Sequence, residues 1–204
     1  MNFTFPLNIE FRFSLFTELR VTDAHGELVA VVKEKTFSIR DEVRVYADEE
    51  RRHQTHGIRA RGLMAGALDW RARREIRRIN GQEVGALQAQ GMRTLWGASY
   101  ELLGPGGETR FTIRDDHPWL GVIEGLISAV PVVGDLVAMG FDYLVNPTYT
   151  VSDAAGQPAY RVHKKRSVFS RRFTVDDLRP GQPQDDELVL LGLVQLVLRE
   201  RERG

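Results

Sequence analysis

Hydrophobic and polar residues alternate along most of the chain, with the two-residue period of β-strands. In the segment FRFSLFTELRVTD, Phe11, Phe13 and Leu15 fall on one face, and Leu19 and Val21 continue the alternation. About twelve short runs of this kind follow one another, separated by turn residues, and this spacing is typical of an antiparallel barrel or sandwich. The pattern therefore predicts a mainly β protein.

Several of these runs are joined by residues that favour tight turns. Asn80-Gly81 stands between two alternating runs, which is the strongest short-range signal for a β-hairpin. A second turn passes through Gly26, and a third lies between Gly104 and Gly107. These turns predict that strands adjacent in sequence pair with each other.

The chain also contains an internal repeat. VTDAHG at 21–26 and VSDAAG at 151–156 match at a constant offset, which also aligns Val45 with Val175. A third, looser copy is IRRINGQEVGAL. One domain over residues 1–204, built from related β-units, explains this better than two unrelated domains. The alternative is that hairpins resemble one another.

The C-terminal segment DDELVLLGLVQLVLRERERG departs from the strand pattern. Leu188 to Leu198 is apolar on every side except at Gly192 and Gln195, and a helix that is apolar all round must be buried. Its length as a helix, about 16 Å, is too short for a bilayer core of about 30 Å. Acidic residues before it and Arg199 after it suit the two ends of a helix dipole. We expect a central helix over residues 185–199 enclosed by the strands, with a buried strand as the alternative.

A second apolar stretch, WLGVIEGLISAVPVVGDLVAMGF, runs from 119 to 141 with only Glu124 and Asp135 as charges. A single membrane span is disfavoured, because an aspartate at the centre of a bilayer costs about 2.5–3.5 kcal/mol. Pro131 and Gly134 also interrupt the middle of the stretch. Two short helices are therefore expected, over residues 117–130 and 135–144.

Together these helices form an inserted helical hairpin over residues 117–145. Gly121, Gly125 and Ala129 recur every four residues and leave a smooth stripe on which another helix could pack, while Trp119 adds apolar bulk elsewhere. The hairpin has three alternative positions: packed on the barrel, buried in a homodimer, or inserted shallowly into a membrane.

Two clusters of basic residues stand out from a chain whose net charge is zero. One is RARREIRR; the other consists of Lys164, Lys165, Arg166, Arg171 and Arg172. Such clusters usually form a solvated outer face. The sharper alternative is a site for anionic lipid headgroups, to which each basic residue near the surface contributes about 1 kcal/mol. Nucleic acid is not expected as a partner, because no aromatic platform accompanies the arginines.

The sequence offers little that is typical of catalysis or metal binding. The absence of cysteine excludes disulfides and thiolate chemistry. His53 and His56 are three residues apart, but in a strand they would point to opposite faces, and no third ligand follows. Asp115 and Asp116 are read as a helix cap rather than as an acid–base pair. We expect no metal, no cofactor and no enzymatic activity; the alternative is a hydrolase that uses scattered aspartate and histidine residues.

The motifs VTDAHGELVAVVKEK, INGQEVGAL and YTVSDAAGQPAYRVHKK, with the terminal helix, resemble the LURP-one-related and tubby C-terminal-like superfamily, to which the phospholipid scramblases belong. The resemblance covers residues 16–198. It implies a twelve-stranded antiparallel barrel closed around a central hydrophobic helix. Tubby-type members bind phosphoinositides through basic residues, and scramblases are tied to lipid movement. No tubby-type lipid-binding motif is matched, so no site residue is transferred from the family.

These observations lead to a functional expectation. The protein is expected to be a non-catalytic module that binds lipid or a membrane surface, with anionic phospholipid headgroups as partners of the basic cluster. The N-terminus lacks the pattern of a signal peptide, so the expected location is cytoplasmic, peripheral at the membrane. The alternative is a protein-interaction or homo-oligomeric scaffold that uses the hairpin at 117–145.

Overall fold

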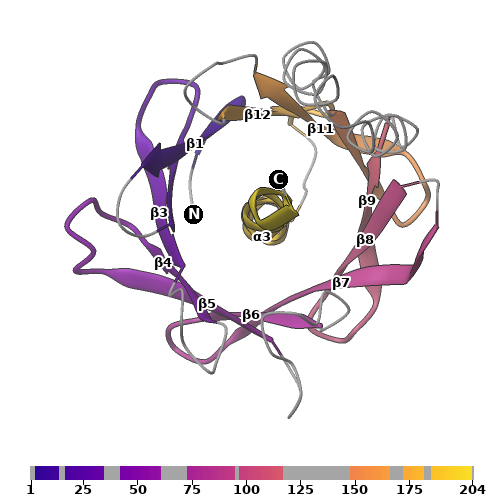
Figure 1. Ribbon diagram of the computed structural model, residues 1–204, viewed down its shortest axis with the longest axis horizontal. Coiled ribbons are helices and arrows are strands. Elements are labelled where there is room, and N and C mark those ends of the chain that lie inside the picture. Colours follow the sequence, from indigo (N-terminus) through magenta and orange to yellow (C-terminus); the bar gives the residue numbers. More distant parts are fainter. Residues whose placement is uncertain are drawn as a thin grey trace, which may run out of the picture.

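The computed structural model shows twelve antiparallel strands closed into one barrel, with a helix along its axis (Figure 1). It describes residues 3–13, 17–34, 42–60, 73–94, 97–116, 148–165, 172–181 and 185–203. The expected closed barrel around a C-terminal helix is therefore confirmed. The helical hairpin expected over 117–145 lies outside the described residues.

The strands follow one another in chain order around the barrel. They are β1 (Leu7–Phe13), β2 (Thr17–Thr22), β3 (Leu28–Glu34), β4 (Glu42–Tyr46), β5 (Gln54–Ala60), β6 (Arg74–Arg78), β7 (Glu83–Thr94), β8 (Gly97–Leu103), β9 (Thr109–Asp115), β10 (Thr148–Asp153), β11 (Pro158–Lys165) and β12 (Arg172–Asp177). Each pairs with its sequence neighbours, and β1 closes the barrel against β12 with Ile9 opposite Phe173. Closure removes the unpaired edges that an open sheet would present.

The inner face of the barrel is mainly apolar, and the outer face is mainly polar and charged. On β4, for example, Val43 and Val45 are buried, whereas Glu42 points outward and accepts hydrogen bonds from Arg44 and Arg59. The side chains of the inner rows and of the central helix form one continuous core. The alternation in the sequence thus corresponds directly to inside and outside.

The central helix α3 (Asp186–Arg203) fills the barrel, and every side chain from Leu188 to Leu198 except glycine is buried. It packs closely on β7 and β8, because a Cβ atom added to Gly192 would lie 2.3 Å from Leu102 Cδ2. The helix continues past the expected end at residue 199. The added residues are arginine and glutamate, which have high helix propensity and extend the helix without needing a core contact.

The antiparallel order divides the connections between two rims. At the turn rim lie the turns 23–27, 47–53, 79–82, 104–108 and 154–157, together with the start of α3. At the distal rim lie the ends of the odd-numbered strands and the beginnings of the even-numbered ones, from Phe13 and Thr17 around to Lys165 and Arg172. The turns of the turn rim are all described, and most are tight.

The internal repeat corresponds to two sets of three strands. The offset that aligns 21–26 with 151–156 also aligns β2, β3 and β4 with β10, β11 and β12. The turns of the two copies are alike. Asp23 and Asp153 each accept two backbone N–H groups of their own turn, and Gly26 and Gly156 have φ of 80° and 78°. Glycine adopts this conformation without steric cost. The repeat is therefore structural.

Candidate functional site: the two rims of the barrel

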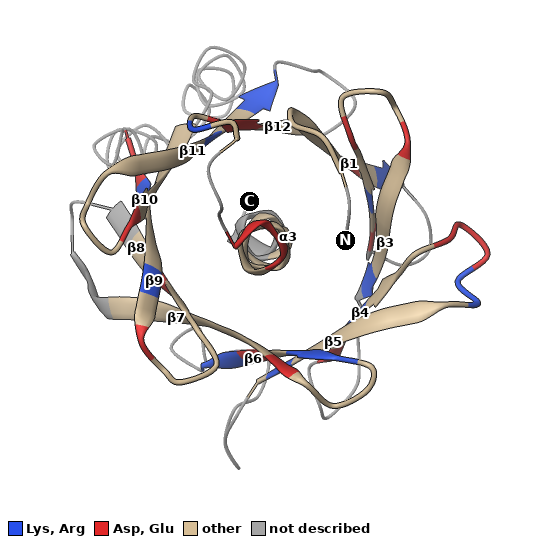
Figure 2. Ribbon diagram, turned by 180° about the vertical axis from the view of Figure 1, so that it is seen from behind, with Lys and Arg blue, Asp and Glu red and all other residues tan. Residues whose placement is uncertain are grey.

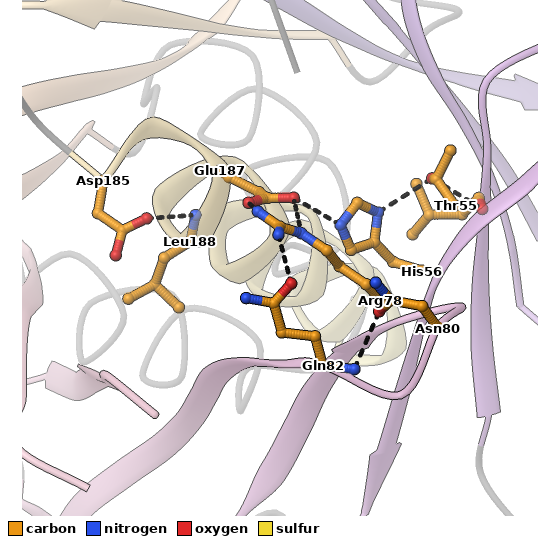
Figure 3. A network of polar contacts seen from close by, with 9 residues as sticks. Thr55, His56, Arg78, Asn80, Gln82, Asp185, Glu187 and Leu188 are labelled. Carbon is orange, nitrogen blue, oxygen red and sulfur yellow. Dashed lines mark hydrogen bonds and ion pairs between the residues drawn. The ribbon is translucent and has the colours of Figure 1, made fainter. Parts of the chain in front are cut away.

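The start of α3 is joined to the barrel wall by a cluster of polar side chains (Figure 3). Glu187 accepts a hydrogen bond from Arg78 Nε at 3.0 Å, and a second, shorter contact joins its other oxygen to the same guanidinium. Its Oε1 also lies 2.8 Å from His56 Nε2. We call Glu187, His56 and Arg78 the helix anchor. The anchor connects α3 to β5 and β6, which lie far from it in sequence.

Two further hydrogen bonds hold the His56 and Arg78 side chains on the sides that face away from Glu187. His56 Nδ1 lies 3.0 Å from Thr55 Oγ1, and Arg78 Nη1 donates to Gln82 Oε1 at 2.6 Å. Both partners belong to the hairpins that carry the anchor, since Thr55 is on β5 and Gln82 is in the turn after β6. The orientations of imidazole and guanidinium are therefore fixed on their far sides as well.

Glu187 and His56 of the helix anchor both have lowered pKa values, but for different reasons. Hydrogen bonds from Arg78 lower the pKa of Glu187 to about 2, against the effect of burial, with a smaller contribution from His56. Burial lowers the pKa of His56 below 6.5, and Glu187 only partly opposes this. At neutral pH the anchor therefore holds a carboxylate, a guanidinium and a neutral imidazole.

The other two acidic residues at the start of α3 point to different parts of the structure. The Tyr160 hydroxyl on β11 donates to Asp186, and burial is the main cause that raises the pKa of this tyrosine. Asp185 caps the helix by accepting the backbone N–H of Leu188, and its burial raises the pKa of its carboxyl group. The first turn of α3 is thus tied to β5 and β6 on one side and to β11 on another.

A hydroxyl, an imidazole and a carboxylate follow one another in Thr55, His56 and Glu187, as they do in a catalytic triad. Their contacts instead fix the position of α3. The His56 side chain is only 3% exposed, so a substrate atom cannot reach it from solvent. The carboxylate is also held by Arg78, and Thr55 Oγ1 lies 3.2 Å from the Val45 carbonyl oxygen. The described contacts of these three residues hold α3 in place.

The two histidines considered as a metal pair have separate partners. His53 is in the turn before β5, 79% exposed and bonded to Asp48, whereas His56 points into the barrel. In the described part of the chain, no three histidine or acidic side chains come together as metal ligands would. Asp116, read as a helix cap, accepts the Thr150 hydroxyl at 3.0 Å.

The helix anchor was not predicted, although each member carried a signal. His56 stands two residues before Ile58, and Arg78 two residues after Ile76, so each belongs to the inward row of its strand. An inward-facing charged or polar residue needs a partner. The acidic start of an apolar helix is the natural partner once that helix is placed inside the barrel.

At the distal rim, the predicted basic cluster is divided between the two faces of the barrel. Lys164 follows Tyr160 and Val162 in the inward row of β11, is half-buried and lies opposite Phe173 of β12. Its side chain makes no hydrogen bond or ion pair with another described residue. Arg166 and Arg171 lie outside the described residues.

The outward members of the cluster already have partners on β1. Arg172 forms an ion pair with Glu10, with Nη2 2.6 Å from Oε1, and Lys165 Nζ donates to Asn8 Oδ1 at 3.2 Å. The Asn8 amide is uncharged, so the charge of Lys165 stays available, whereas Glu10 neutralises that of Arg172. Within the described residues, Lys164 and Lys165 are therefore the cations of the cluster that lack an acidic partner.

The apolar stretch 119–141 leaves and rejoins the barrel close to these lysines. It connects β9 to β10, and Asp116 N donates to Thr148 O at 2.9 Å where the two strands meet. The basic cluster lies between β11 and β12, the next two strands around the same rim. The candidate contacts Trp119, Gly121, Gly125 and Ala129 themselves lie outside the described residues.

The turn rim carries many acidic residues. Its turns and the start of α3 carry the acidic residues Asp23, Glu27, Asp48, Glu49, Glu50, Glu108, Asp153, Asp185, Asp186 and Glu187. The acidic first turn of α3 is seen in the middle of the barrel in Figure 2. Fewer arginines accompany them, namely Arg51, Arg52, Arg78, Arg110 and Arg179, of which Arg110 pairs with Glu108 and Arg179 with Asp153. A net charge of zero thus conceals a turn rim with an acidic excess.

Within the described residues, no helix combines the length and hydropathy that crossing a membrane requires. Comparisons with protein-family models, with curated proteins and with solved structures gave no match to this chain.

Proposed function

We propose that this protein is a non-catalytic module of the tubby-like and LURP-one-related type that binds the surface of anionic membranes through its distal rim. The observation that carries the proposal is topological. The strand ends that flank the apolar stretch 119–141 and those that flank the basic cluster are neighbours on one rim. Apolar insertion and cationic attraction together hold a protein at a membrane where one signal alone is marginal.

The opposite rim supports the same orientation. There the turns carry an acidic excess, and an anionic surface repels them. The N-terminal segment also packs there, with the Phe5 ring 5.4 Å from that of Tyr160. A barrel approaching an anionic membrane is therefore turned with its distal rim toward the lipid.

A binding test with vesicles addresses the proposal directly. The wild-type protein should co-float with vesicles that contain phosphatidylserine and much less with neutral vesicles, and added salt should release it by screening. Replacing both lysines that lack an acidic partner, as Lys164→Glu/Lys165→Glu, should reduce binding by roughly 30-fold or more, because each cation near the surface contributes about 1 kcal/mol. Trp119→Ala should lower binding to both kinds of vesicle.

A matched control separates the rim from net charge. Arg52→Glu/Arg161→Glu makes the same change in charge at exposed positions, one in a turn of the turn rim and the other midway along β11. This variant should bind like the wild type. Equal losses in the two double variants would show that net charge, and not the distal rim, governs binding.

The second candidate function, a homo-oligomeric scaffold, rests on the stripe of Gly121, Gly125 and Ala129. It predicts a dimer in solution that Gly125→Leu converts to a monomer, as measured by sedimentation. Such a result, with no flotation of the wild type on any vesicle, would contradict the membrane proposal and favour the scaffold.

A further inference from the structure

We propose that the helix anchor is an acid-sensitive latch, which holds the first turn of α3 against the barrel wall at neutral pH and releases it on acidification. This inference does not depend on the proposed function. It rests on the placement of a buried histidine between a strand and the only helix among the described residues (Figure 3).

The hydrogen bonds of the latch suit a neutral imidazole and an imidazolium alike. When the ring is neutral with its proton on Nε2, that nitrogen donates to Glu187 Oε1 at 2.8 Å, and Nδ1 can accept the Thr55 hydroxyl at 3.0 Å. Protonation turns Nδ1 into a donor, after which the Thr55 hydroxyl donates to the Val45 carbonyl oxygen, 3.2 Å away. The hydrogen bonds can therefore be kept, and the cost of protonation lies in the charge.

That charge would be placed on a buried ring, next to a carboxylate that is already paired with a partly exposed guanidinium. The His56 side chain is 3% exposed. Glu187 on α3 attracts an imidazolium, but its carboxylate is shared with Arg78 on β6, and the positive charge of Arg78 repels the imidazolium. Burial is the largest effect, and it lowers the pKa of His56 below the ordinary value of 6.5.

The direction of the pH effect follows from proton counting. An opened latch exposes His56, which then takes up a proton near pH 6.5, whereas the closed latch does so only at lower pH. Opening therefore consumes a proton in that interval, and the opening constant rises by up to about tenfold for each unit that the pH falls. The free energy that closes the latch is fully present above pH 6.5 and is lost as the pH falls through the lowered value.

Glu187 adds a second pH interval, separate from that of His56, in which opening of the latch takes up a proton. Its pKa of about 2 in the closed latch compares with 4.5 when it is exposed, so opening consumes a further proton between these values. Asp185 has the opposite sign, because burial raises its pKa, so opening releases a proton from it and reduces the net effect. The interval just below pH 6.5 therefore reports His56 alone within the anchor.

Hydrogen exchange of the α3 amides measures the opening directly, once the exchange rates are corrected for the intrinsic effect of pH. Between pH 7.5 and 5.5 the protection of the first turns of α3 in the wild type should fall as the pH falls. In His56→Gln the dependence over this range should disappear. His53→Gln changes an exposed histidine of the same hairpin and should retain the wild-type dependence.

Glu187→Gln provides a second variant, because a glutamine oxygen still accepts the His56 proton while the attraction for an imidazolium is lost. It should open at higher pH than the wild type. Protection of α3 that does not change over this pH range in the wild type would overturn the proposal. So would a wild-type pH dependence in His56→Gln. If His56→Gln does not fold, the shift of Glu187→Gln toward higher pH decides the question.

Discussion

Leu193→Asp is expected to abolish folding of the barrel. Leu193 lies in the middle of α3, has no exposed surface and is surrounded by the continuous apolar core. An aspartate there would place a charge among apolar side chains with no described cation in the core cluster to pair with it. The cost of such a burial is several kcal/mol, which is comparable to a total stability of about 5–15 kcal/mol.

Far- and near-ultraviolet circular dichroism of the purified variant would measure this loss, together with its soluble yield. Ile79→Asp is the matched control, because Ile79 is 66% exposed in the turn after β6 and its replacement should leave the fold intact. A Leu193→Asp protein that melts at the wild-type temperature would show that α3 is not enclosed by the barrel.

The enclosed helix could be predicted from sequence because its physical requirement is local. A run that is apolar on all sides must be surrounded, and a chain otherwise made of short alternating strands offers only a barrel to surround it. The two rims could also have been predicted. In a barrel whose neighbours pair in chain order, every second connection falls on the same rim, so the stretch after Asp115 and the cluster after Val162 lie together.

The helix anchor could not be predicted in the same way, because it joins residues that are far apart in sequence. Glu187 is separated from His56 by 131 positions and from Arg78 by 109. Alternation shows that both wall residues point inward, but not which part of α3 they meet. That depends on how far the helix enters the barrel, which the close packing of Gly192 on Leu102 determines.

The partners of the basic cluster could not be predicted for the same reason, because they too lie far away in the sequence. The sequence shows Lys165 and Arg172 as two cations, whereas closure of β12 against β1 brings Asn8 and Glu10 beside them. Only the register of the closing strands shows that Glu10 neutralises Arg172 while an amide leaves the charge of Lys165 unpaired.

Gly85→Ala is expected to destabilise the protein by about 3 kcal/mol or more, because it combines backbone strain with overpacking. Gly85 lies on β7 opposite Ile76, where the register shifts, and has a φ of 156°. A Cβ atom there would lie 2.2 Å from the Leu103 carbonyl oxygen and 2.8 Å from Leu188 Cδ1. The carbonyl oxygen is part of β8, so it cannot rotate away as a flexible side chain could.

Relief of this clash requires β7 to move away from β8 and α3 to move from the wall, which loosens the side of the barrel where the helix packs most closely. Denaturant unfolding of the variant would measure the loss. Gly57→Ala is the matched control: it lies on the nearby strand β5, its φ is not positive, and the nearest atoms to an added Cβ are 3.9 Å away. Its effect should be small. A Gly85→Ala protein as stable as Gly57→Ala would mean that α3 and the β7–β8 wall are not in contact at Leu188.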